Sequence, residues 1–157
     1  MQEYLMLKTL GYDLSISTPS IFMWKFLDET LSDDKIKNLS SFFIDLCLVW
    51  YETCTFRPSI LTAAAIYTAH ATVRRRKPCS KIYEQLTGCS VGQIWKCSRL
   101  MVTSHIKARS VESVYKKYNT SRYNWVARAR PARFLLTKFS KAMFITFKLI
   151  LFLLKDT

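Results

Sequence analysis

The side chains that could act as a base or a nucleophile are few, and they lie far apart in the sequence. The chain has two histidines, His70 and His105, and neither is accompanied by the Ser, Cys or Asp pattern that indicates a catalytic triad. His70 lies in an alanine-rich segment predicted to be a central helix, where a packed histidine is more common than a general base. The histidines therefore predict no catalytic site.

Two acidic pairs, Asp28-Glu29 and Asp33-Asp34, are the residues from which a paired general acid and base could be built. We interpret them instead as a solvated turn and as charges at a helix N-terminus, where the helix dipole favours carboxylates. No glycine-rich phosphate loop is present, because the glycines stand singly at positions 11, 88 and 92. We therefore expect no enzyme and no cofactor.

Five cysteines, at positions 47, 54, 79, 89 and 97, could bind a metal or form disulfides. Their odd number and the absence of a Cys-x-x-Cys pair or an N-terminal secretion signal indicate a reducing compartment, so we expect the nucleus, the cytoplasm or both. Both histidines lie far from any cysteine pair, which favours structural thiols over a zinc site. Cys47 falls on an apolar helical face, where a free thiol packs as a small hydrophobe.

The net charge of +13 is concentrated in the second half of the chain. Residues 1–72 carry five Lys/Arg and eight Asp/Glu, whereas residues 73–157 carry nineteen and three. A basic half of this size suits nucleic acid, an anionic membrane or an acidic protein partner, and the sign alone does not choose among them. For the run from Arg74 to Lys77, the pattern favours charges at a helix C-terminus and a solvated face over phosphate contacts.

The composition predicts one all-α domain with five principal helices and one short turn between the third and the fourth. Half of the 157 residues are hydrophobic, and only three glycines and four prolines are present, which favours long helices over many short strands. Residues 1–14 indicate the end of a helix and a linker, with Leu5, Leu7 and Leu10 requiring a core that nothing upstream supplies. We therefore expect a missing N-terminal portion.

Helix starts and apolar spacing place the first two principal helices. Thr18 as N-cap and Pro19 at the first position open a helix whose inward side is expected to contain Ile21, Phe22 and Phe26. Ser32 or Asp33 begins the next helix. Its apolar positions recur at three and four residues, at Leu39, Phe42, Phe43, Leu46, Cys47 and Trp50.

The third helix, opened by Pro58, is predicted to be the centre of the domain. Its side chains are unusually small on several faces, and small side chains let neighbouring helices approach closely. Gly88 is expected to close a short helix in the left-handed conformation. Two further helices follow from the spacing of Val91 to His105 and of Val111 to Tyr118. The alanines of the central helix are Ala63, Ala64, Ala65, Ala69 and Ala71.

The C-terminal tail, residues 128–157, is basic and then hydrophobic, and we expect it to be helical. Residues 134–154 are long enough to cross a bilayer, but Lys138, Lys141 and Lys148 interrupt them, and a lysine near mid-membrane costs about 2.5–3.5 kcal/mol. An interfacial amphipathic helix and an extra helix packed on the domain or on a partner are the other interpretations. Of these three interpretations, a membrane-spanning helix is the least expected.

Several segments together resemble the C-terminal domain of A/B-type, or mitotic, cyclins. LKTLGYDLSISTPSIFMWKFL resembles the linker into the second cyclin fold, and SSFFIDLCLVWYETCTFRPSILTAAAIYTA is similar to its second and third helices, including the step Arg57-Pro58-Ser59. YEQLTGCSVGQIWKCSRLM resembles the family's segment of leucine, threonine, glycine and then helix. VYKKYNTSRYNWVA resembles the closing signature, at Lys117-Tyr118, Arg122-Tyr123 and Val126-Ala127.

The resemblance implies a single five-helix cyclin fold over residues 15–127 and a regulatory subunit of a cyclin-dependent protein kinase in mitotic cell-cycle control. Such a subunit activates its kinase by binding and not by chemistry. The family's N-terminal cyclin box has no counterpart here, and residues 1–10 are expected to be the remnant of its last helix. The sequence names no partner-binding residue. Two alternatives stay open, a nucleic-acid-binding cyclin-fold module and a membrane-associated adaptor acting through the tail, of which nucleic acid is the less expected partner.

Overall fold

The computed structural model describes residues 2–12, 17–28 and 33–137, and all regular structure in these ranges is helical. The helices are α1 (Gln2–Thr9), α2 (Pro19–Asp28), α3 (Asp34–Leu48), α4 (Tyr51–Cys54), α5 (Pro58–Arg74), α6 (Ser80–Thr87), α7 (Val91–Ile106) and α8 (Glu112–Tyr118). Four short 3-10 turns follow α7, namely η1 (Ala108–Ser110), η2 (Ser121–Tyr123), η3 (Val126–Arg128) and η4 (Arg133–Leu135). The five predicted principal helices are α2, α3, α5, α7 and α8.

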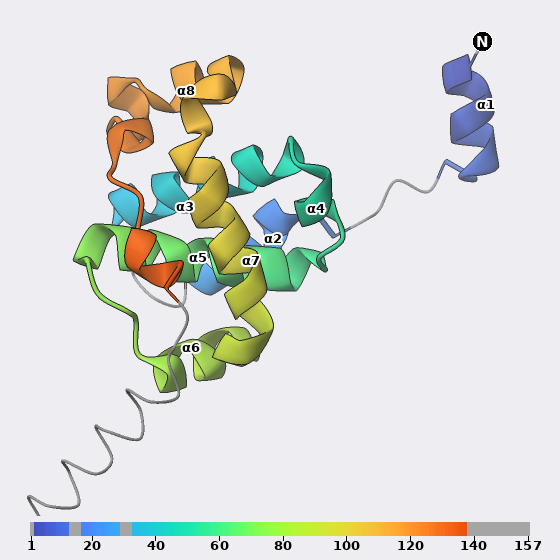
Figure 1. Ribbon diagram of the computed structural model, residues 1–157. Helices are drawn as coiled ribbons and strands as arrows, with labels where there is room; N and C mark the ends of the chain where they lie inside the picture. Colours follow the sequence, from blue (N-terminus) through green and yellow to red (C-terminus); the bar gives the residue numbers. More distant parts are fainter. Residues whose placement is uncertain (1, 13–16, 29–32, 138–157) are drawn as a thin grey trace, which may run out of the picture.

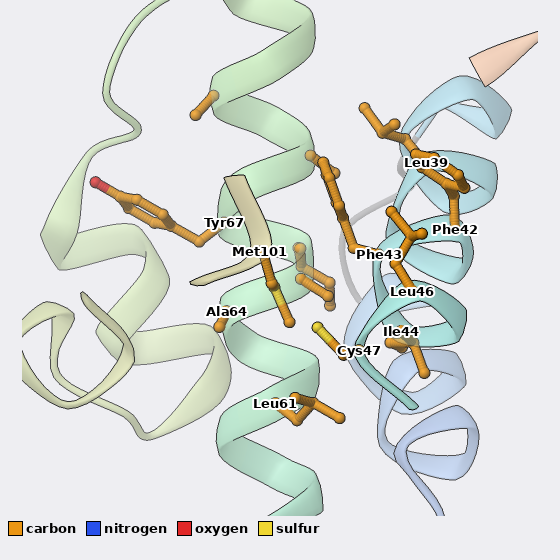
Figure 2. Packing of buried hydrophobic residues seen from close by; sticks show 14 of the residues in the cluster. Leu39, Phe42, Phe43, Ile44, Leu46, Cys47, Leu61, Ala64, Tyr67 and Met101 are labelled. Carbon is orange, nitrogen blue, oxygen red and sulfur yellow. The ribbon is translucent and has the colours of Figure 1, made fainter. Parts of the chain in front are cut away.

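Helix α5 is the centre of the bundle, as the sequence predicts. It packs against α2, α3, α6 and α7, and α7 crosses it in Figure 1. All five of its alanines are fully buried, so the backbones of the neighbouring helices can approach its axis closely. Figure 2 shows the α3 side chains Phe43 and Cys47 and the α7 side chain Met101 gathered beside it. The apolar core is therefore built around a helix that buries five alanines.

Buried hydroxyl groups in α5 are satisfied locally. Thr68 Oγ1 donates to the carbonyl oxygen of Ala64 at 2.7 Å, and Thr72 Oγ1 donates to that of Thr68 at 2.7 Å. Thr62 Oγ1 lies 2.8 Å from the carbonyl oxygen of Pro58 and 2.9 Å from that of Pro19, which ties α5 to the start of α2. These bonds let polar side chains enter the core without an uncompensated loss of hydration.

The helix boundaries follow local signals. Asp33 caps α3 by accepting a hydrogen bond from the backbone N–H of Lys35 at 3.3 Å, and Pro58 occupies the first position of α5. Gly88 ends α6 with a φ of +64°, the left-handed conformation expected of it. Ser90 and Gln93 form a capping box at the start of α7.

Two details of the sequence prediction are wrong. Ile21 lies on the outer side of α2, 60% exposed, and the buried side is formed by Met23, Phe26 and Leu27. Trp50 does not continue α3, which ends at Leu48; it precedes the separate four-residue helix α4. Trp50 is half-buried after the break, so the apolar spacing continues across it. Periodicity alone does not show the break.

The two ends of the described chain differ in packing. Helix α1 buries none of its residues and stands apart from the other helices in Figure 1, so its leucines find no core among the described residues. Residues 129–132, which we call the strap, follow η3 and lead into η4; Ala132 at the end of the strap and Leu135 in η4 are fully buried. No described helix is long and apolar enough to span a membrane. The predicted hydrophobic helix lies outside the described residues from position 138 onward.

Candidate binding surfaces

His70 is used in packing. Its ring meets the ring of Tyr83 edge-on, with 5.6 Å between centroids. Burial, and after it the positive charge of Arg74, lowers the pKa of His70 to about 4, so the imidazole is neutral at physiological pH. No nucleophile is placed beside it by any contact of the described residues, and its position on α5 serves the α5–α6 contact.

His105 has a different environment at the end of α7. Only 4% of its surface is exposed, and its ring lies edge-on to Phe42 and Phe43, at centroid distances of 5.5 and 5.2 Å. Burial lowers the pKa of His105 to about 4, a hydrogen-bonding interaction with the backbone of Ala129 opposes this shift, and the charge of Arg75 adds to it. Beyond this interaction with Ala129, neither ring nitrogen makes a hydrogen bond of normal geometry with a described residue. A buried polar group in this condition marks a site that requires explanation.

The cysteines are free thiols at four described positions, with Cys47 and Cys97 buried, Cys89 half-buried and Cys79 exposed. Burial raises the pKa of Cys97 to about 12, which makes it an inert packing residue. The side chain of Cys54 lies outside the described part. Among the described residues, no three His, Cys, Asp or Glu side chains gather as metal ligands.

Of the two acidic pairs, the structure describes the side chains of only one. Asp33 is the N-cap of α3 and Asp34 begins its first turn, which agrees with their interpretation as helix N-terminal charges. Glu29 and the side chain of Asp28 lie outside the described residues.

The basic run at the end of α5 is partly engaged in the fold. Arg74 is the last residue of α5, and Arg75, in the left-handed conformation, donates from Nη1 to the carbonyl oxygen of Arg130 at 3.0 Å. This bond fixes the strap against the end of α5. Lys77 Nζ lies over the ring of Trp95, 5.5 Å from its centroid. The run therefore does not form a continuous free cationic stripe.

The closing segment of the chain joins α8 to α3. Lys117 Nζ and the hydroxyl of Tyr118 both bind Oδ2 of Asp45, at 2.7 and 2.8 Å. The ring of Tyr118 lies between Phe42, at 5.3 Å, and Tyr123, at 4.7 Å. Burial, and after it the hydrogen bond to Asp45, raises the pKa of Tyr118. These residues hold the fold together and are not free for a partner.

The sequence reasoning missed a hollow that we call the arginine pocket, a cavity of about 550 Å³. It lies between the end of α7, η1, α8, η3, the strap and η4. Four arginines line it, and no Asp or Glu does. Ala and Pro side chains, Ile106 and Tyr115 complete its wall, with His105 at its inner side. The residues are His105, Ile106, Ala108, Arg109, Tyr115, Ala127, Arg128, Ala129, Arg130, Pro131 and Arg133.

A second hollow, of about 650 Å³, lies between α2, the start of α3 and η2. Its lining has both signs of charge, with Asp34, Lys37 and Arg122. Trp24, 62% exposed, forms part of its apolar wall. The mixed charge contrasts with the uniformly cationic lining of the arginine pocket. The only signal for either hollow in the sequence was the general excess of Lys and Arg after residue 73.

Comparison with known proteins gives a consistent result. A family profile described as "Cyclin, C-terminal domain" matches residues 17–132. Over 136 residues, or 85% of its length, the chain is 44% identical to Cyclin-B2-3 of Arabidopsis thaliana. It is 43% identical to Cyclin-B2-2 of Oryza sativa subsp. indica and 41% identical to G2/mitotic-specific cyclin-2 of Medicago sativa over the same number of residues. The match covers 32% of each of the first two relatives and 42% of the third. The chain thus spans less than half the length of these relatives.

Proposed function

The chain belongs to the cyclin family, and on that premise we propose that it is the C-terminal module of a mitotic, B-type cyclin that regulates a cyclin-dependent protein kinase. The observation that carries the proposal is the match of residues 17–132 to the C-terminal cyclin domain. The resemblance to mitotic cyclins at about 40% identity supports the cell-cycle role. These relatives give no support to the nucleic-acid or membrane alternatives.

The module acts by binding and not by catalysis. Its contribution is rigidity, because the fully buried alanines of α5 leave little freedom for the surrounding helices to move relative to one another. A rigid helical surface can bias mobile elements of a kinase towards their active arrangement. In this proposal the module braces a preceding cyclin box, and the uncovered leucines of α1 support a packing contact with that box.

We place this function in the nucleus, the cytoplasm or both. The support is chemical, since Cys47, Cys79, Cys89 and Cys97 are free thiols in the fold and persist as such in a reducing compartment. A fluorescent fusion of the full chain, observed in dividing cells, tests the location.

A chimera tests the kinase role. Residues 1–157 replace the corresponding C-terminal segment of the Arabidopsis relative Cyclin-B2-3, and the chimera is co-expressed with a cyclin-dependent kinase. We expect phosphorylation of a histone substrate well above that of the kinase alone. The matched control carries Phe43→Ala, which removes a fully buried ring from the core and should abolish activation. A folded chimera that binds the kinase without raising its activity would contradict the proposal.

A further inference from the structure

We propose that the arginine pocket is a binding site for a phosphate monoester carried on a partner protein, with Arg109, Arg128, Arg130 and Arg133 around the anion and His105 beneath it. The four arginines that line this one concavity come from η1, η3, the strap and η4. Guanidinium groups present paired N–H donors whose geometry matches phosphate oxygens.

The positive charge in the pocket is not neutralised by the described part of the protein. No carboxylate lines it. The carboxylates of neighbouring elements are engaged elsewhere: Glu112 binds Lys116 at 2.5 Å, and Asp45 binds Lys117 and Tyr118. The carboxyl end of α7 contributes about half a negative charge. That is about an eighth of the charge of four guanidinium groups, so helix capping alone does not account for the cluster.

His105 supplies an independent observation that points to a ligand. Its imidazole is more than nine-tenths buried and lines the pocket, and apart from the interaction with the backbone of Ala129 neither ring nitrogen makes a hydrogen bond of normal geometry with a described residue. Leaving such a group unpaired costs stability, whereas a phosphate oxygen in the pocket would accept a hydrogen bond from its N–H. A neutral imidazole can donate one such bond, so the site does not require a charged histidine.

The pocket is already formed and held open by contacts outside it. Arg75 fixes the strap through the carbonyl oxygen of Arg130, so the guanidinium group of Arg130 takes no part in this bond. Arg128 Nε donates to Asn119 Oδ1 at 2.6 Å, which orients that side chain. Prior positioning of this kind reduces the entropy that binding must overcome.

The shape favours a phosphorylated side chain over nucleic acid. A volume of about 550 Å³ with apolar walls from Ala108, Ala127 and Pro131 suits one phosphate and the residue that carries it. Nucleic acid instead requires phosphate contacts spread along a strand or groove, and the run after α5 is engaged by the strap and by Trp95. The choice of a phosphoprotein also rests on the proposed function, because a kinase-regulating module works beside phosphorylated proteins.

Binding to the full chain tests the site without a kinase, so its failure is distinct from failure of the chimera to activate. The probe is a peptide library with a fixed central phosphoserine and degenerate flanks, compared with the same library bearing serine. We expect the phosphorylated library to bind and to shift the Arg Nε–H signals of Arg109 and Arg130 in NMR spectra of the labelled chain.

Charge-matched variants locate the binding. Arg109→Gln/Arg130→Gln should weaken phosphopeptide affinity at least about tenfold, and Arg57→Gln/Arg76→Gln, which removes two exposed charges outside the pocket, should change it less than about twofold. His105→Phe keeps a ring between Phe42 and Phe43 but removes the donor, and should weaken binding about threefold or more. Melting curves of each variant establish that it is folded.

Four results would overturn the proposal. One is no preference for the phosphorylated library, and another is an equal loss of affinity in both double variants. A third is inorganic phosphate binding as tightly as the peptide, which would assign the pocket to free phosphate. The last is a short duplex DNA that binds through Arg109 and Arg130 in place of the phosphopeptide, which would assign the pocket to nucleic acid.

Discussion

The core around α5 and the arginine pocket differ in how far their polar groups are satisfied by other groups of the chain, although His105 borders both. In helix α5, the hydroxyls of Thr68 and Thr72 each donate to a carbonyl oxygen four residues earlier, so these two buried groups need no further partner. In the pocket, four arginines and His105 line one cavity, and no carboxylate is among the lining residues. The buried hydroxyls of Thr68 and Thr72 are therefore satisfied within the chain, whereas the positive charge of the pocket is balanced only by an added anion.

The largest effect on the free energy of unfolding is expected from a substitution in the core. Phe43→Ala removes a ring that is fully buried against α5 and His105, and it should lower the free energy of unfolding by about 3–5 kcal/mol through lost burial and a residual cavity. Chemical denaturation measures the change. The exposed ring of Tyr51, 82% accessible, provides the control, since Tyr51→Ala should change stability by less than about 0.5 kcal/mol. Equal effects would mean that α3 does not face the core.

Enlarging a central alanine should be the next most damaging change. Ala65→Leu forces three additional carbon atoms between helices that already touch, and should cost about 1–3 kcal/mol or more. Gln85→Leu on the exposed side of α6 adds an apolar side chain without crowding and is the control. Thermal melting of both variants gives the comparison. A stable Ala65→Leu protein would show that close approach to α5 is not required.

His105, which borders both the core and the arginine pocket, should make the stability of the fold depend on pH. Its pKa is about 4 in the fold and about 6.5 in an unfolded chain, so the unfolded state binds the additional proton between these values. The stability contributed by the neutral ring is present above about pH 6.5 and is lost as the pH falls towards 4. As the pH falls through this window, the free energy of unfolding of the His105→Phe variant should decrease by about 1–3 kcal/mol less than that of the native chain. Chemical denaturation at each pH measures the difference.

His70 sets the comparison for that experiment, because its pKa is also lowered to about 4 but it lies outside the pocket. His70→Phe should likewise flatten the pH profile, while leaving phosphopeptide binding unchanged. An identical loss of binding in the two histidine variants would contradict a specific role for His105.

The smallest effect on stability is expected in the arginine pocket itself. Arg109→Gln/Arg130→Gln removes two exposed charges that form no ion pair with a described residue, and it should change the free energy of unfolding by no more than about 0.5 kcal/mol. A small increase in stability would follow from reduced repulsion among the arginines. A loss of several kcal/mol would show that these side chains serve the fold and not a ligand.

Much of the fold could be predicted because its signals are local. Pro58 at the start of α5, Asp33 as the cap of α3 and Gly88 at the end of α6 each act through the conformation of a few neighbouring residues. The apolar spacing of α3 and α7 fixes which side of each helix is buried. The same reasoning failed for Trp50 and Ile21, since spacing continues across a helix break and a mostly apolar helix such as α2 does not specify its inner side.

By itself, the sequence determined the helices, the alanine-lined centre and the resemblance to cyclins, because periodicity and capping depend on residues within one or two turns. Only the tertiary structure decided that His105, Arg109, Arg128, Arg130 and Arg133 surround one cavity. These residues lie on separate short elements, and their convergence depends on the path of the strap, which Arg75 fixes from the far end of α5. Contacts of that kind are set by packing between distant segments, and no local pattern encodes them.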